Sequence, residues 1–307
     1  MSGEFLPGRT LRMTVAASTD PGRRRSENQD RYLVADLSDR DPDGALMEGG
    51  EGAPGPRGPT AIEVGPRGAL LMVADGMGGA AGGATASAMA CRAVGGLLST
   101  GWGELRTGTP RELGRHLEIA VEEANRLIHT RSEADERLQG MGTTATVVAV
   151  MEGHLVLAQV GDSRAYLMRD GAVTQLTRDQ SVVQMLQDAG EIDAEEAKTD
   201  RRANLILQAL GTLPDVKVDV THQPLRRGDV LLLCSDGLSG LVEGEEMAER
   251  IRTAALDESA TTLVQLANER GGPDNITVVL AHFDGDALVP ANPGDLVGRM
   301  RLDLEER

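Results

Sequence analysis

Four aspartates lie where apolar segments of this 307-residue chain meet tight turns. Asp75 ends "MVAD" before a glycine cluster, Asp162 ends "QVGD", Asp236 ends "LLCSD" and Asp274 opens "DNITVVL". One Asp-Gly pair is usually only a turn, but four such carboxylates at strand ends can converge on one point. Gathered carboxylates repel one another unless protons or cations lie among them. Because no His or Cys accompanies them, these oxygen donors favour Mg²⁺ or Mn²⁺ over Zn²⁺.

The glycine cluster in "VADGMGGAAGG" (73–83) has a second interpretation. Residues 76–81 fit the pattern Gly-x-Gly-x-x-Ala, which binds the pyrophosphate of a dinucleotide between a strand and a helix. Asp75 would then face the pyrophosphate, and the stretch "CRAVGGLLST" (91–100) offers no acid to bind the ribose. We therefore favour a metal site, in which the glycines let a cation approach a backbone carbonyl and let the next helix pack closely.

A basic stretch, "TDPGRRRSENQD" (19–30), places Arg23, Arg24 and Arg25 close to Asp30. Such a stretch is commonly a solvent-exposed turn. Beside a metal–carboxylate site, however, an arginine could bind a phosphoryl group with two parallel hydrogen bonds.

The elements that must position these residues are short apolar strands joined by tight turns. The turn signals Glu152-Gly153 and Asp170-Gly171 join neighbouring strands as hairpins rather than through crossover helices. This arrangement, with helices elsewhere, predicts an α+β fold with antiparallel sheets. The expected strands are 12–18, 31–37, 69–75, 143–151, 154–162, 165–170, 228–236 and 275–283.

The clearest helix is expected over 109–131, where Thr109 and Glu112 form a capping box and Pro110 takes the first helical position. Other helices are predicted over 83–99, 181–200, 245–255 and 259–270. The Gly- and Pro-rich segment 38–68 predicts a long mobile loop, and the polar, aperiodic residues 284–307 predict a C-terminal tail.

Composition narrows the classes of function. A net charge of −17 argues against binding to nucleic acid or an anionic membrane, but it suits divalent cations. No segment approaches the ~18–20 apolar residues of a membrane span, and the N-terminus lacks a signal-peptide pattern. We therefore expect a cytoplasmic protein in which Cys91 and Cys234 are buried free thiols.

These motifs resemble those of the type-2C, metal-dependent protein serine/threonine phosphatases (PPM family) in their compact bacterial form. The stretch from Asp20 to Asp30, with Gly22, Arg25 and Asn28 between them, is similar to the family's first motif, and "VADGMGG" (73–79) to its second. The others follow in the family's order: "GTTAT" (142–146), "VGDSR" (160–164), "LTRDQS" (176–181), "LILQALG" (205–211), "LLLCSDGL" (231–238) and "GGPDNITVV" (271–279). The match predicts one phosphatase domain over 12–283, including the loop 38–68 and a flap over 181–204, followed by the tail 284–307.

The resemblance implies a four-layer α-β-β-α sandwich of two antiparallel sheets flanked by helices, with a metal cleft at one edge. Asp75 would bridge two Mn²⁺ or Mg²⁺ ions, and the Gly76 carbonyl would ligate one of them. Asp236 and Asp274 would complete the shell of the first ion, and Asp30 would act on the second, directly or through water.

The resemblance also implies a third, weaker metal held by Asp162 together with Asp236. Arg25 would bind the substrate phosphate, and Asn275 would hydrogen-bond near the metal waters. The implied activity is hydrolysis of phosphoserine and phosphothreonine by a water that bridges the two ions. The partners would be phosphorylated proteins and a bacterial Ser/Thr kinase that the enzyme opposes, with the monomer as the family's default.

Three positions depart from the family's pattern. Met77 stands where some members carry a His proposed as the general acid, Ala80 replaces a common His, and Gln208 stands where Arg is frequent. The first leaves the proton donor open, and the changes beside the flap bear on substrate preference. The alternative function is a catalytically silent pseudophosphatase acting as a regulatory binding module. That alternative would require loss of a metal ligand or of Arg25, and all are present.

Overall fold

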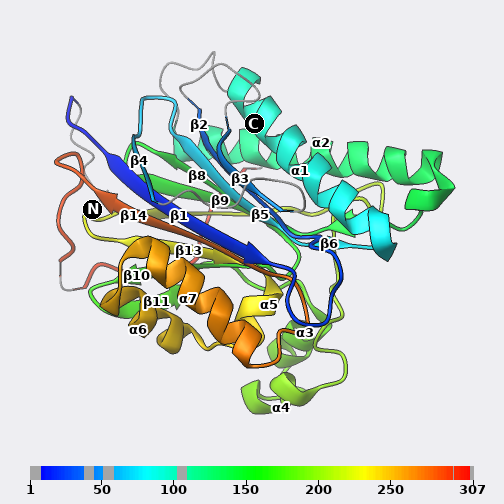
Figure 1. Ribbon diagram of the computed structural model, residues 1–307. Coiled ribbons are helices and arrows are strands. Elements are labelled where there is room, and N and C mark those ends of the chain that lie inside the picture. The colour runs from blue at the N-terminus through cyan, green and yellow to red at the C-terminus, as the bar shows by residue number, and fades with distance from the viewer. Residues whose placement is uncertain (1–7, 38–44, 51–58, 102–108, 293, 305–307) are drawn as a thin grey trace.

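Two large antiparallel sheets lie face to face in the computed structural model, which describes residues 8–304 apart from 38–44, 51–58, 102–108 and 293 (Figure 1). The first is a six-stranded sheet with the order β11-β10-β13-β14-β1-β4. Its strands are β1 (Arg12–Asp20), β4 (Thr60–Glu63), β10 (Arg164–Arg169), β11 (Ala172–Gln175), β13 (Val230–Cys234) and β14 (Ile276–Asp284).

The second sheet has seven strands in the order β15-β12-β9-β8-β5-β2-β3. They are β2 (Arg31–Asp36), β3 (Ala45–Gly49), β5 (Ala69–Ala74), β8 (Ala145–Met151), β9 (His154–Val160), β12 (Asp219–Pro224) and β15 (Met300–Arg301). A further small pair, β6 (Gly76–Met77) and β7 (Gly142–Thr143), extends the turn after β5. The predicted Glu152-Gly153 hairpin joins β8 to β9, and both of its residues have positive φ.

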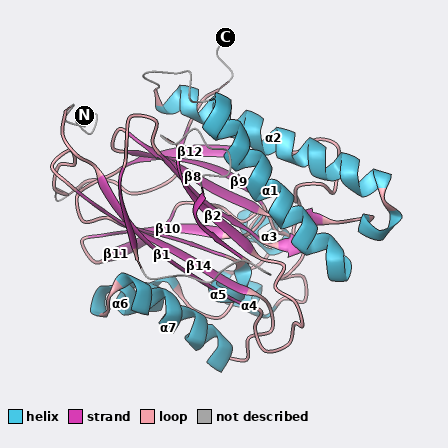
Figure 2. Ribbon diagram, turned by 45° about the horizontal axis from the view of Figure 1, so that its top comes forward, coloured by secondary structure: helices cyan, strands magenta, loops and turns pink. Residues whose placement is uncertain are grey.

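Helices cover the outer face of each sheet, so the molecule has four layers (Figures 1 and 2). Helices α1 (Gly79–Gly101) and α2 (Pro110–Ala134) pack on the second sheet. Helices α6 (Gly244–Thr253) and α7 (Leu256–Glu269) pack on the first, beside the one-turn α5 (Asp236–Ser239). The described residues also include the short helices α3 (Val182–Asp188) and α4 (Ala194–Thr199) and the 3₁₀ turn η2 (Glu136–Leu138). The four-layer sandwich implied by the family resemblance is confirmed.

Strand β5 is continuously apolar in sequence because both of its faces are buried. All six of its residues are buried: Leu71 and Val73 face the core between the sheets, while Leu70 and Met72 face α1 and α2. A strand covered on both faces does not show the alternating pattern of a half-exposed strand. This buried strand delivers Asp75 rigidly to the edge of the sandwich.

The two outer helices were predicted with different accuracy. Helix α2 begins as expected, because Thr109 and Glu112 form both hydrogen bonds of the capping box and Pro110 is its first residue. Helix α1 begins at Gly79, four residues before the predicted start, because glycines mask the beginning of a helix in sequence. The predicted helix over 181–200 is two short helices, α3 and α4, separated by a turn.

The prediction of a loop over the whole segment 38–68 is wrong in its described parts. Strand β3 pairs with β2 at the edge of the second sheet, and β4 pairs with β1 at the edge of the first. Short edge strands flanked by Gly and Pro carry too little periodicity to be recognised in sequence. Strand β12 was also missed, and it lies between β9 and β15.

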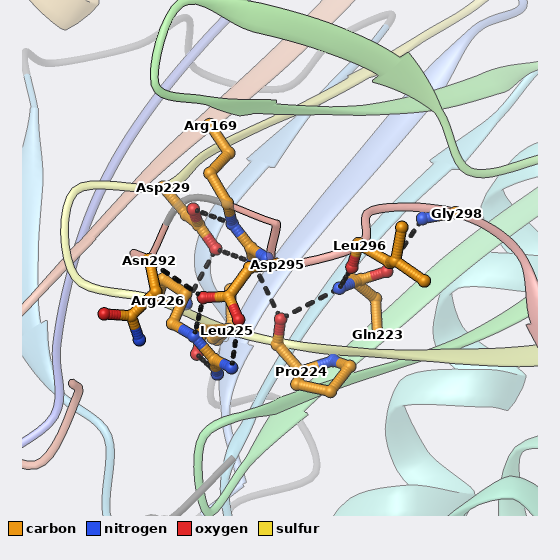
Figure 3. Close-up of polar contacts among 10 residues, drawn as sticks. All are labelled: Arg169, Gln223, Pro224, Leu225, Arg226, Asp229, Asn292, Asp295, Leu296 and Gly298. Carbon is orange, nitrogen blue, oxygen red and sulfur yellow. Dashed lines mark hydrogen bonds and ion pairs between the residues drawn. The ribbon is translucent and has the colours of Figure 1, made fainter. Parts of the chain in front are cut away.

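The polar C-terminal segment packs against the rest of the domain. We call residues 285–304, apart from 293, the C-terminal strap. Figure 3 shows its anchor: Arg226 Nε donates to Asp295 Oδ2 over 2.6 Å, and Gly298 N–H donates to Gln223 Oε1 over 2.9 Å. Strand β15 then pairs with β12. The prediction of a tail is therefore corrected for this segment, since hydrogen bonds and ion pairs hold it where hydrophobic periodicity gives no signal.

Two smaller expectations concern thiols and membranes. Cys91 and Cys234 are free and buried, as predicted. Across the described part of the chain, no helix has the length and apolar character needed to cross a bilayer.

Candidate active site

The turn after β5 is fixed by two threonines of the "GTTAT" motif. The backbone N–H of Asp75 donates to Thr144 Oγ1 over 2.9 Å, and the Asp75 carbonyl accepts from Thr144 N–H over 2.8 Å. Thr143 Oγ1 donates to the same carbonyl over 2.9 Å. Gly76 follows, where a Cβ would lie 2.2 Å from the Gly83 carbonyl, so only glycine fits. The Asp75 carboxylate is therefore presented by a backbone bonded on both sides.

Asp30 lies at the bottom of the site and is fully buried. Its Oδ2 accepts hydrogen bonds from Ser235 Oγ and Thr277 Oγ1, each 2.7 Å long. Its Oδ1 is also buried and has no hydrogen-bond partner. Ser235 and Thr277 were not predicted; the only signal was a hydroxyl inside two otherwise apolar segments, "LLLCSD" and "NITVVL".

Asp236 and Asp274 lie next to the ends of two neighbouring strands of the first sheet. Asp236 begins α5 just after β13, and Asp274 lies two residues before β14. One oxygen of Asp236, Oδ1, is buried without a hydrogen-bond partner. Asp274 Oδ2 accepts from Arg25 Nη2 over 2.7 Å, and the Arg25 side chain is 57% exposed. The arginine expected to hold phosphate is therefore at the acidic cluster and open to solvent.

The loop that carries Arg25 is tied down by Asn275. The Asn275 Oδ1 accepts from Gln29 N–H over 2.8 Å, and its Nδ2 donates to the carbonyls of Pro21 and Glu27. Gly22 supports the same loop, with a φ of +81° and a hypothetical Cβ only 2.1 Å from the Asp274 carbonyl. Asn275 was expected to hydrogen-bond near metal waters, but in this structure its amide holds the Arg25 loop.

These residues surround a cleft of about 610 Å³ at the edge of the sandwich. Asp162, which follows β9, also reaches it, as does Met77. The segment 204–206 forms part of the wall beside the flap. Cleft-lining residues that the predicted site includes are Arg25, Asp75, Gly76, Asp162, Asp236, Asp274 and Asn275, with Asp30 buried beneath them. Every residue of the predicted site is thus brought together.

The electrostatics of the cluster are those of crowded anions. Burial raises the pKa of Asp75 well above its usual range, and the charges of Asp30, Asp236, Asp162 and Asp274 raise it further. Burial likewise raises the pKa values of Asp30 and Asp162 to about 7, with Asp236 adding to both. Asp75 feels all four other carboxylates, so it lies at the electrostatic centre of the cluster.

A divalent cation would answer the two features that the protein alone leaves unsatisfied. These are the repulsion among the carboxylates and the partnerless buried oxygens of Asp30 and Asp236. Within the described residues, no three His, Cys, Asp or Glu side chains already stand arranged to hold an ion. Asp274, one of the carboxylates of the cleft, is paired with Arg25 instead. The donor set is all oxygen, which fits Mn²⁺ or Mg²⁺, and Asp274 would have to exchange its arginine for the ion.

The Gly-x-Gly pattern does not belong to a dinucleotide-binding unit. Strand β5, which precedes it, pairs antiparallel with both β2 and β8. In a dinucleotide-binding unit the corresponding strand lies in a parallel βαβ arrangement. The glycines instead permit the close turn that carries Asp75.

The fold is thus a sandwich of two antiparallel sheets between helices, with an acidic cleft and an arginine at one edge. The chain belongs to the protein phosphatase 2C family, whose model matches residues 60–280. This agrees with the family that the sequence motifs resemble.

Individual relatives support the same assignment. The serine/threonine phosphatase stp of Listeria monocytogenes is 37% identical over 268 residues, which is 87% of this chain and 94% of that protein. The crystal structure of the Mycobacterium tuberculosis serine/threonine phosphatase PstP/Ppp has a TM-score of 0.71 and 36% identity, covering 90% of this chain and 99% of that one. A PstP catalytic domain in complex with two manganese ions gives a TM-score of 0.70 at 36% identity, covering 89% of this chain and 99% of that chain.

Proposed function

We propose that this chain hydrolyses phosphoserine and phosphothreonine in proteins with the help of two Mn²⁺ or Mg²⁺ ions. The observation that carries the proposal is the cleft itself. It gathers Asp75, Asp236 and Asp274 with a partly exposed arginine, above a buried carboxylate oxygen that lacks a partner. Membership of the protein phosphatase 2C family supports it.

The ion-binding residues would be Asp75 as the shared ligand, the Gly76 carbonyl, Asp236 and Asp274, with Asp30 acting directly or through water. When bound, paired divalent ions lower the pKa of a water toward neutrality and neutralise the phosphate oxygens. The protein's own part is positioning. Thr143 and Thr144 hold the Asp75 backbone. Ser235 and Thr277 hold one oxygen of Asp30, and its other oxygen is left without a hydrogen-bond partner.

Arg25 would bind the phosphate group of the substrate. Its guanidinium lies against Asp274 and is partly exposed, so it can turn toward an incoming anion while it stays near the carboxylates. Cys91 and Cys234 are buried and neither is among the residues that line the cleft, and burial raises the pKa of both thiols to about 12. Direct attack by water therefore agrees with the residues at hand.

The first prediction concerns Arg25. Replacement by alanine should raise KM for a phosphothreonine peptide about tenfold to a hundredfold, since a charge-assisted contact contributes about 1.5–3 kcal/mol. Turnover of p-nitrophenyl phosphate should fall less. Steady-state kinetics at saturating Mn²⁺ measures both quantities. A Mn²⁺ titration is the control: because the substitution frees Asp274 from its ion pair with Arg25, the affinity for Mn²⁺ should not fall. If the variant keeps wild-type kinetics on both substrates, Arg25 does not bind the substrate phosphate.

The second prediction concerns Asp162, the proposed ligand of a third, weaker ion shared with Asp236. The Asp162→Ala variant should lose turnover, by about tenfold to a hundredfold, yet retain two bound ions. Elemental analysis after gel filtration measures the ions. A content of one ion or none would instead place Asp162 in the primary pair.

We further propose that the protein acts as a cytoplasmic monomer that opposes a Ser/Thr kinase. The buried, unpaired thiols agree with a reducing compartment. The direct test of the function is release of p-nitrophenol from its phosphate ester, which should require Mn²⁺ or Mg²⁺ and disappear in Asp236→Ala. A properly folded wild-type protein that binds phosphopeptides without turnover at any metal concentration would instead be a pseudophosphatase.

A further inference from the structure

A second hollow adjoins the cleft at the segment 204–208. Residues 204–206 line the cleft, whereas Leu207 and Gln208 line this second hollow, which has a volume of about 330 Å³. We call it the flank groove. Its other walls come from 178–181, Met185 and Asp188 at the base of the flap, from 217–219, and from Arg299 and Arg301 of the C-terminal strap. Four separate stretches of the chain therefore build it.

The flank groove is rich in cations on a protein of net charge −17. Arg178 pairs with Asp188, and Arg299 and Arg301 share the single carboxylate of Asp219. Lys217 is exposed and, among the described residues, has no ion pair. The third acid of the groove, Asp179, is already bound by Arg164 from outside it. The groove therefore holds more positive charge than its own carboxylates balance.

Apolar side chains lie alongside these charges. Met185 is 49% exposed and Leu207 47% exposed within the groove, and Leu205, which lines the cleft, is 53% exposed. Exposed leucine and methionine beside cations suit a peptide that lays its backbone and aliphatic carbons on the surface. The apolar side chains also continue from cleft to groove, so one bound chain could contact both.

The groove is held in shape before any ligand arrives. Gln208 Oε1 accepts from Lys217 N–H over 2.9 Å, and Gln208 Nε2 donates to the Lys217 carbonyl over 3.3 Å. Pairing of β15 with β12 brings Arg301 beside Thr221, and the anchor in Figure 3 fixes the strap that leads to it. A preformed site loses less conformational entropy on binding. Gln208, which departs from the family's pattern, is here the residue that holds Lys217.

We propose that the flank groove binds an anionic stretch of the substrate protein, made of Asp, Glu or a second phosphorylated residue. The proposal rests on the proposed phosphatase function of the neighbouring cleft. Four Cα steps span at most about 15 Å, so residues 204 and 208, which line the two hollows, lie no farther apart than about five residues of an extended substrate. Lys217 and Arg301 are the cations that would meet its charges.

The test uses the full chain with Mn²⁺ and two sets of phosphothreonine peptides. The two sets have the same sequence except at the four positions that lie five to eight residues from the phosphothreonine. One set carries four Glu there and the other four Gln, on the N-terminal or the C-terminal side. We expect a kcat/KM about threefold to tenfold higher for the Glu peptide on one side, the size of one or two exposed ion pairs. The preference should vanish in about 0.5 M salt.

Lys217→Glu should abolish or invert that preference. Arg252→Glu, the same charge reversal at an exposed site on α6, should keep it and so controls for net charge. The proposal that the flank groove binds an anionic stretch would be overturned by either of two results. One is an equal kcat/KM for the Glu and Gln peptides in the wild type, and the other is a preference for Glu that survives Lys217→Glu. Wild-type turnover of p-nitrophenyl phosphate, which is too small to reach the groove, separates this from failure at the cleft. Its absence would overturn the phosphatase function and the groove together.

Discussion

Asp75→Asn should lower the Mn²⁺-dependent turnover of p-nitrophenyl phosphate by about 10³-fold or more. Asp75 is the carboxylate whose pKa is raised by all four of the others, so its charge is the one most central to any ion bound there. An asparagine keeps the shape and the backbone hydrogen bonds to Thr144 but removes the negative charge. Steady-state kinetics across a Mn²⁺ titration measures the loss, and high Mn²⁺ should restore little of it.

The same substitution should stabilise the metal-free protein. Removing one charge from crowded carboxylates relieves repulsion, so the Tm in EDTA should rise by a few degrees. The matched control is Asp284→Asn at the exposed end of β14, which should change neither quantity. A variant that loses turnover because it is destabilised would contradict this account, since activity and metal-free stability are expected to move in opposite directions.

Removal of divalent ions is expected to have an equally large effect. Stripping with EDTA at pH 8 should abolish turnover and lower the Tm, and Mn²⁺ should restore both. An ion at 100 times its Kd adds about 2.7 kcal/mol to the stability of the folded state. For a chain of 307 residues that corresponds to a Tm difference of about 4 °C for each ion. Calorimetry with and without Mn²⁺ measures it.

The Tm difference should depend on pH with a defined sign. The pKa values of Asp30 and Asp162 are raised to about 7 in the metal-free fold, above the ordinary Asp value of about 3.9. Between pH 4 and 7 the folded state therefore holds more protons than the unfolded chain, and these groups stabilise it less as the pH rises. Protons also compete with Mn²⁺. The difference in Tm between Mn²⁺-loaded and metal-free protein should thus become smaller from pH 8 to pH 5.5. A larger difference at pH 5.5 would contradict the raised pKa values of Asp30 and Asp162 in the metal-free fold.

Much of the site could be predicted because its residues lie in short motifs next to apolar strands. Asp75, Asp236 and Asp274 each stand at a turn that the sequence makes visible, and the strands delivering them are buried on both faces. The pairing of Arg25 with Asp274 could not be predicted, because these residues lie at opposite ends of the chain and meet only when β1 pairs with β14. The hydroxyls of Ser235 and Thr277, which donate hydrogen bonds to Asp30, were missed for the same reason.

The fold was predicted well where a segment has its own periodicity or cap. Helix α2 is the clearest case, since its capping box and its buried face are both written in local sequence. Strands β3, β4 and β15 are short edge strands, and they form because a neighbour offers unpaired backbone groups. The C-terminal strap depends on ion pairs with residues far away, such as Arg226 with Asp295. Patterns within the segment itself cannot reveal such partners.

The central claim is that aspartates distant in the chain hold a pair of divalent ions. Anomalous diffraction at the manganese edge from crystals grown with Mn²⁺ tests it most directly. We predict two peaks about 3.5–4 Å apart, with Asp75 between them and Asp236 and Asp274 on one of them. No peak in the cleft, with Asp274 still bound to Arg25 and the three carboxylates directed away from a common point, would contradict the account.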